Sequence, residues 1–79
     1  PDPRIDAART LRRMAQISRG RGEVDRSRVE LTRALATLTT AQALAVRAHD
    51  DEAVVEVLIE RGRCFLDLDD VPAARADFE

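Results

Sequence analysis

Cys64 and His49 are the side chains of this sequence best suited to nucleophilic catalysis. A cysteine acts as a nucleophile in its thiolate form, which requires a nearby base such as a histidine. Cys64, however, directly precedes Phe65 in an apolar segment, and no catalytic signature surrounds it. A buried cysteine in such a segment behaves as a small apolar side chain. We therefore expect an inert Cys64, no catalytic residue and no enzymatic activity.

A metal site is the second chemistry to consider. His49 is followed by Asp50, Asp51 and Glu52, and this mixture of nitrogen and oxygen donors could bind a metal ion. The same residue types are typical of a solvated turn in which an Asp caps the next helix. We favour the capping interpretation and expect neither a metal nor another cofactor.

Glu56 and Glu60 are one helical turn apart and could form an acid and base pair. Glu60 also lies three residues before Arg63, so ion pairing at the helix surface is the simpler interpretation. The sequence Gly20-Arg21-Gly22 does not predict a phosphate-binding loop, because it follows a predicted helix and such loops follow a strand.

The arginines are concentrated in the first part of the chain. Residues 1–33 contain nine Arg and five acidic residues, a balance of +4, whereas residues 34–79 contain four Arg and ten acidic residues, a balance of −6. Polar residues at helical spacing form a row in the first part: Arg9, Arg12, Arg13, Gln16 and Arg19. This row is either an ordinary solvated face or a binding surface. Aromatic residues do not interleave with it, so nucleic acid is not an expected partner.

Composition limits the elements that can carry these residues. The 79 residues suffice for one small domain, and 44% apolar with 35% charged residues is typical of a folded, soluble chain. There is no Tyr or Trp and there are only two Phe, so the core must be aliphatic and Ala-rich, which suits close helix packing. No apolar run reaches the length of a membrane span and no signal peptide is present. We expect a cytoplasmic protein without a membrane partner, and a chain that begins with Pro1 suggests a fragment of a larger protein.

Apolar spacings of three and four predict helices throughout, and no alternating strand pattern is present. The first helix, residues 3–19, should bury one face and end at two glycines with left-handed backbone. The residues of that face are Ile5, Ala8, Leu11, Met14, Ala15 and Ser18, and the glycines are Gly20 and Gly22. The second helix, residues 23–48, should bury the face formed by Val24, Arg28, Leu31, Leu35, Leu38, Gln42 and Ala45.

The second helix is unusually long, and its middle contains Thr37, Thr39 and Thr40. Threonine weakens helix propensity, so a break near Thr39 remains open. A third helix should follow the capping Asp50 or Asp51 and end near residues 67–69. A fourth, truncated helix should begin at Asp70. The fold class is therefore all-α, with about four helices in antiparallel hairpins.

The third and fourth predicted helices contain a spaced set of large and small residues: Leu58, Gly62, Phe65, Ala74 and Phe78. This set resembles the tetratricopeptide repeat, in which small residues stand where two helices touch and aromatic residues fill the space beside them. The chain would be one repeat module over residues 1–79, with a degenerate repeat at 3–41 and a better-matching, incomplete repeat at 42–79. The segment around residues 43–53 is also similar to longer-period repeats of bacterial regulatory proteins.

The resemblance implies that the first helix of each repeat lines a groove for a partner's peptide or helix. It assigns partner-binding positions to Arg9, Arg12, Arg13, Gln16 and Arg19 in the first repeat, and to Glu56, Ile59, Glu60, Arg63 and Asp67 in the second. Arg12 and Gln16 fall where carboxylate-binding members have a base and an Asn. Glu60 falls where a second Asn or base is needed, which argues against recognition of a C-terminal carboxylate.

Two functions remain open. The first is a non-catalytic protein-interaction module, a scaffold or regulatory segment that binds another protein or peptide, with an acidic partner favoured by the arginine row. The alternative is a self-associating element in which Val24, Leu31, Leu35 and Leu38 form a dimer seam. Self-association could also involve an exposed helix edge formed by Val71, Ala74 and Phe78.

Overall fold

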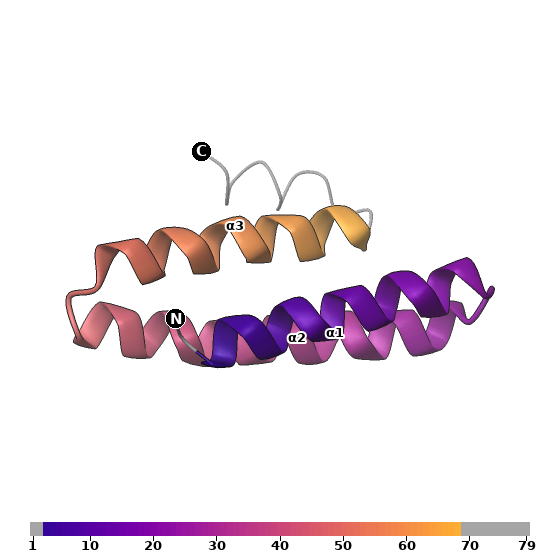
Figure 1. Ribbon diagram of the computed structural model, residues 1–79, viewed down its shortest axis with the longest axis horizontal. Coiled ribbons are helices and arrows are strands. Elements are labelled where there is room, and N and C mark those ends of the chain that lie inside the picture. The colour runs from indigo at the N-terminus through magenta and orange to yellow at the C-terminus, as the bar shows by residue number, and fades with distance from the viewer. Residues whose placement is uncertain (1–2, 69–79) are drawn as a thin grey trace.

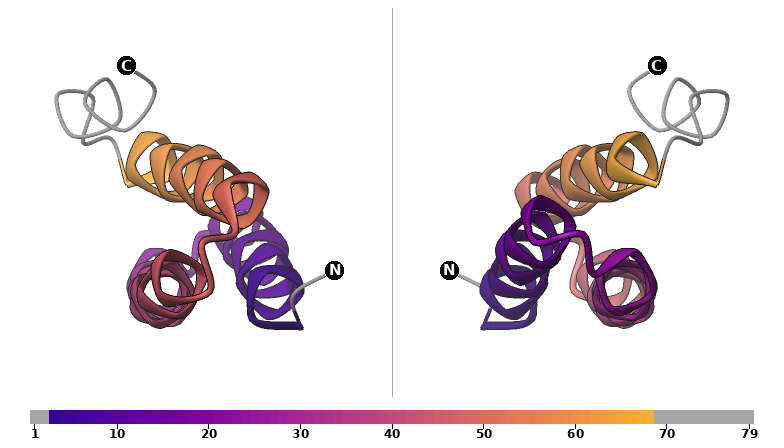
Figure 2. Two further views of the ribbon diagram at one scale, coloured as in Figure 1. Left: turned by 90° about the vertical axis from the view of Figure 1, so that its left-hand side faces the viewer. Right: turned by 90° about the vertical axis from the view of Figure 1, so that its right-hand side faces the viewer.

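Three α-helices make up the described part of the protein, a computed structural model that describes residues 3–68. They are α1 (Pro3–Gly20), α2 (Val24–Arg47) and α3 (Asp51–Asp67). α1 and α2 form an antiparallel hairpin, and α3 runs back alongside it, antiparallel to α2 (Figure 1, Figure 2). The all-α class is confirmed. The fourth helix expected from Asp70 lies outside the described residues, as do Ala74 and Phe78.

The turn after α1 ends the helix with two specific hydrogen bonds. The Gly22 amide donates to the Arg19 carbonyl at 3.0 Å, and the Glu23 amide donates to the Ser18 carbonyl at 2.9 Å. Together they form a Schellman motif, which requires a residue with left-handed backbone, usually glycine. Gly22 has that conformation with φ of 79°. Gly20 does not, because it is the last residue of α1.

The turn after α2 has the same geometry without a glycine. The His49 amide donates to the Val46 carbonyl at 3.1 Å, and the Asp50 amide donates to the Ala45 carbonyl at 2.9 Å. His49 takes the left-handed conformation with φ of 54°. Asp50 then caps α3, since its carboxylate accepts a hydrogen bond from the Ala53 amide at 3.2 Å. Of the two aspartates expected to cap this helix, Asp50 is the one that does so.

α2 is continuous through its threonines, so the break left open near Thr39 does not occur. Each threonine hydroxyl donates to the carbonyl oxygen one turn earlier, Thr37 to Arg33 at 2.9 Å and Thr39 to Leu35 at 3.0 Å. These bonds satisfy the hydroxyl groups within the helix itself. α2 is therefore one uninterrupted helix of 24 residues, longer than the 18-residue α1 with which it forms the hairpin.

The core is small and rich in alanine. Its buried members are Ile5, Ala8 and Ala15 from α1, Leu31, Ala34, Leu38 and Ala41 from α2, and Val57 and Cys64 from α3. Alanine at the contact lets helix axes approach closely, as expected from a sequence almost without aromatic residues.

The buried face of α2 differs from the predicted one. Val24 and Arg28 were expected on that face, but both are exposed, and Ser27 and Glu30 are buried instead. The Ser27 hydroxyl donates to the Ala15 carbonyl at 2.9 Å. A small polar residue is favoured at this position because it brings the helices together and uses its hydroxyl on the neighbouring backbone. Met14, expected on the buried face of α1, is also exposed.

Candidate functional site

Glu60 lies at the centre of the contact between α1 and α3. Its side chain is only 2% exposed, and three arginines surround its carboxylate. Arg9 Nε donates to Oε1 at 3.1 Å, Arg63 donates to the same oxygen at 2.9 Å, and Arg12 Nε lies 3.6 Å from Oε2. Pairing of Glu60 with Arg63 is confirmed, but the expected surface location is wrong. α1 covers Glu60, and such burial is tolerated because the arginines compensate its charge.

Arg9 connects several carboxylates of the two helices. Besides Glu60 it lies 4.0 Å from Glu56 and 3.4 Å from Asp6. The pKa of Arg9 is raised above its ordinary value, chiefly by the hydrogen bond to Glu60. Its charge is therefore permanent, and it attaches the start of α1 to the middle of α3.

A second carboxylate, Asp67, lies at the end of α3 beside the other polar residues of α1. Asp67 is 3.8 Å from Arg12 and accepts a long hydrogen bond from the Gln16 amide at 3.5 Å. The Asp67 backbone carbonyl accepts a hydrogen bond from Arg19 at 3.0 Å. Asp67 thus pairs with Arg12, which Glu60 also approaches, and it connects Gln16 and Arg19 to the end of α3.

The arginine row is consequently not a free basic surface. Arg9, Arg12, Gln16 and Arg19 all contact α3, and Arg63 contributes from α3 itself. Within residues 3–68, Arg13 makes no ion pair. The predicted partner-binding residues are therefore brought together, but mainly as contacts between the helices of one chain.

Two carboxylate oxygens in the described structure are buried without a hydrogen bond, Glu60 Oε2 and Glu30 Oε2. The other oxygen of Glu30 accepts a hydrogen bond from the Ser18 hydroxyl at 2.6 Å, inside the α1–α2 hairpin. Arg26 approaches that oxygen to 3.8 Å. The apolar spacing of α2 does not predict a buried Glu30, which lies on the same helix face as the buried Ser27 three residues earlier.

Cys64 and His49 do not form a catalytic pair. Cys64 is buried in the core, and desolvation raises the pKa of its thiol to about 11. His49 is exposed in the turn before α3, so the two residues are separated by most of that helix, roughly 20 Å. The expected burial of Cys64 is confirmed.

The acidic turn before α3 carries its predicted capping function. Within the described ranges, no group of three or more His, Cys, Asp or Glu side chains is arranged to hold a metal ion. Over the same residues, none of the helices combines the length and hydrophobicity of a membrane span.

An apolar stripe remains exposed on α3. It consists of Val55, Ile59 and Leu66, which are 55%, 37% and 44% exposed. The spacings of four and seven place the three on one helix face, here called the α3 stripe. Segment 53–59 contains more apolar residues than a single helix face can bury, so the sequence itself indicates that some of them are exposed.

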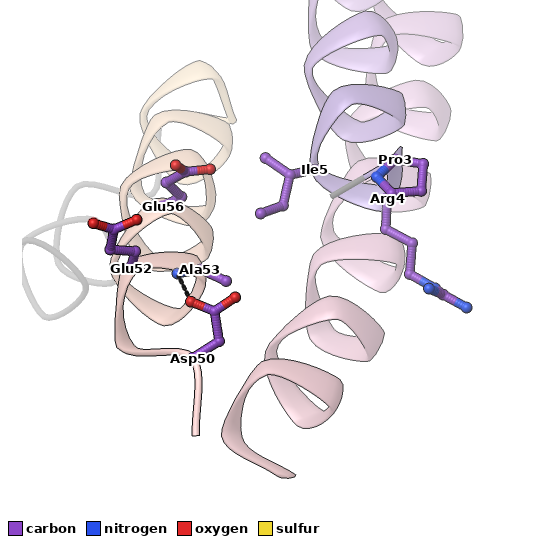
Figure 3. Close-up of a pocket in the computed structure, with 7 residues that line it drawn as sticks. All are labelled: Pro3, Arg4, Ile5, Asp50, Glu52, Ala53 and Glu56. Atoms are coloured by element: carbon purple, nitrogen blue, oxygen red, sulfur yellow. Dashed lines mark hydrogen bonds between the residues drawn. The ribbon is translucent and has the colours of Figure 1, made fainter. Parts of the chain in front are cut away.

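Acidic residues border the first half of the α3 stripe, and we refer to Asp51, Glu52 and Glu56 as the acidic rim. Beside the rim, an open hollow of about 520 Å³ separates the start of α1 from the start of α3. Figure 3 shows Ile5 pointing toward α3 and the Arg4 guanidinium pointing away from the carboxylates. The hollow is therefore acidic on its α3 side and apolar at its base. Its lining residues are Pro3, Arg4, Ile5, Asp50, Glu52, Ala53 and Glu56.

The repeat positions within α3 are placed as follows. Gly62 is buried, whereas Leu58 and Phe65 are half-buried. The Arg61 guanidinium lies 6.0 Å from the centre of the Phe65 ring and donates to the Gln42 side chain at 2.9 Å. These contacts join α3 to α2.

The chain matches no protein-family model, and comparisons with curated proteins and with solved structures give no match.

Proposed function

We propose that this chain is a non-catalytic protein-interaction module, in which a partner's helix or peptide binds along the α3 stripe. The observation that carries this proposal is the exposure of Val55, Ile59 and Leu66 on one face of a helix. Three large apolar side chains at helical spacing match the anchor pattern by which amphipathic helices are recognised. Polar residues on both sides would form the rim of the interface.

The charge of the proposed partner differs from the sequence-based expectation. An acidic partner at the arginine row would have to displace Glu60 or Asp67 from their arginines. The acidic rim, by contrast, includes Asp51 and Glu52, which make no ion pair within residues 3–68. A basic amphipathic helix therefore fits better, with apolar anchors on the α3 stripe and cations facing the rim.

The tetratricopeptide-like architecture and a cytoplasmic location belong to the same proposal. The order of two antiparallel hairpin helices followed by a third that packs on both is compatible with such an array. α1 and α3, the first helices of the two proposed repeats, lie next to each other across the Glu60 ion pairs. Ile59 of the α3 stripe is also one of the positions that the resemblance assigns to the groove.

Self-association through the predicted dimer seam is less favoured. Leu31 and Leu38 belong to the core of a single chain, so only Val24 and part of Leu35 remain accessible. A second chain could not bury that seam unless the hairpin opened.

Methyl-resolved NMR titration tests the proposed function. The probe is a synthetic amphipathic helix with Leu on one face and Lys on the other, and a matched peptide with Glu in place of Lys is the control. We expect the Lys peptide to shift the methyl signals of Val55, Ile59 and Leu66 and the Glu peptide to shift them much less. Val55→Ser should weaken the effect, whereas Val29→Ser, an exposed valine on α2, should not. Shifts confined to methyl groups elsewhere would contradict the proposal.

A further inference from the structure

A second exposed apolar surface lies on α1 and has the opposite charge. Met14 and Ile17 are 43% and 58% exposed, and exposed Arg13 and Arg21 lie beside them. Neither arginine makes an ion pair within the described structure. We call these four residues the basic patch. A shallow hollow of about 110 Å³ next to Met14 and Ile17 extends to α2.

The basic patch complements the first half of the α3 stripe. Both surfaces have two neighbouring apolar side chains, Met14 with Ile17 and Val55 with Ile59. Both are bordered by charges that have no partner within residues 3–68, arginines on one surface and Asp51 and Glu52 on the other. Unpaired charges of opposite sign around apolar centres are the features of complementary protein surfaces.

We propose that a second copy of this chain occupies the α3 stripe through its basic patch. This assignment rests on the proposed function, because it names the partner of the same stripe. It explains why the charges that border each surface are left without partners inside one chain.

The position of the two surfaces determines the kind of assembly. α3 begins at one end of the molecule's 40 Å long axis, and the turn between α1 and α2 lies at the other end (Figure 1). One copy therefore cannot join its own two surfaces. A contact between unlike surfaces is heterologous, so each added copy leaves one surface of each kind free. The expected assembly is a head-to-tail chain that grows with concentration and shortens with salt.

Sedimentation analysis of two single variants tests this arrangement. Val55→Arg disrupts the α3 stripe and keeps the basic patch. Ile17→Glu disrupts the basic patch and keeps the α3 stripe. Both positions are exposed, so circular dichroism should show unchanged helix content. We expect the average mass of the wild type to rise with concentration, and association of each variant alone to be weaker by about tenfold or more.

The mixture of the two variants provides the decisive measurement. Each retains the surface that the other lacks, so the mixture should form a one-to-one dimer that does not grow further. Val29→Arg serves as the control for added charge and should associate like the wild type. A wild-type chain that stays monomeric at low salt and high concentration, or two variants that fail to pair, would overturn the proposal. After either result, binding of the Lys peptide at Val55 would still support the proposed interaction function of the α3 stripe. If the Lys peptide also failed to bind, both the self-association and the proposed function would be refuted.

Discussion

A charged side chain as deeply buried as Glu60 remains stable only while its partners stay in place. Arg9 and Arg63 both hydrogen-bond to one of its oxygens, and Arg12 approaches the other. All three arginines retain some contact with water, so they can be solvated again if the carboxylate is lost. Removing the Glu60 charge should therefore reduce the free energy of unfolding less than removing one partner of a fully enclosed ion pair would.

Glu60→Gln should reduce the free energy of unfolding by about 1–3 kcal/mol, because the shape is kept and the charge-assisted hydrogen bonds are lost. Glu56→Gln is the matched control. That side chain is 50% exposed and 4.0 Å from Arg9, so the change should be within about 0.5 kcal/mol. Urea unfolding of both variants measures the difference. Equal effects would mean that α3 is not held to α1 by Glu60.

Cys64 gives the protein an alkaline titration of its own. The sequence contains no Lys and no Tyr, so no other side chain ordinarily titrates between pH 9 and 11. Burial raises the thiol pKa from 9.0 to about 11, so in this range the unfolded chain loses its proton first. The stability associated with the neutral thiol is therefore complete below pH 9 and is lost as the pH rises toward 11.

We expect the free energy of unfolding to fall by about 2–3 kcal/mol between pH 9 and pH 11. Cys64→Ala should remove this slope whatever its effect on stability at neutral pH. Urea unfolding across the pH range gives the slope, and ultraviolet absorbance of the thiolate gives the pKa directly. A thiol that titrates near pH 9 in the folded chain would show that Cys64 is accessible.

At the scale of the elements, the two turns place different residues in the same backbone conformation. Gly22 adopts the left-handed region without steric cost, whereas His49 must place a Cβ atom there. A Cβ atom added at Gly22 would meet nothing within 4 Å, so a substitution there tests the backbone alone. The pair of turns therefore isolates the contribution of one left-handed residue.

Gly22→Ala should destabilise the hairpin by about 1 kcal/mol, since alanine disfavours a positive φ. His49→Gly should have the opposite sign and stabilise by about 0.5 kcal/mol, because relief of strain exceeds the added freedom of the unfolded chain. Thermal unfolding of the two variants measures both. A loss of stability in His49→Gly would show that the imidazole itself stabilises the turn.

At the scale of the whole molecule, the two helix contacts differ in chemistry. Alanines and small polar residues join α1 to α2, whereas ion pairs around Glu60 and Asp67 contribute much of the contact between α1 and α3. Arginines from the basic first part of the chain thus pair with carboxylates from its acidic second part. The turn after α1 and the start of α3, beside which the basic patch and the acidic rim lie, are at opposite ends of the molecule (Figure 1).

The sequence by itself determined the helices, because their signals are local. Apolar spacing, a proline after Asp2, Gly22 and the capping Asp50 each act within a few residues, and the three helix ranges agree with the structure to within one or two residues. The burial of Cys64 could be predicted for the same reason, from its position in an apolar helical segment.

Only the tertiary structure decided which charges meet. Arg9 and Glu60 are 51 residues apart, and no local pattern shows that α3 turns its carboxylates toward α1. The sequence therefore predicted a free arginine row where the fold has an ion-paired interface. It also assigned Val24 instead of Ser27 to the core, because close approach of two helices favours small side chains that a hydrophobicity pattern ranks low.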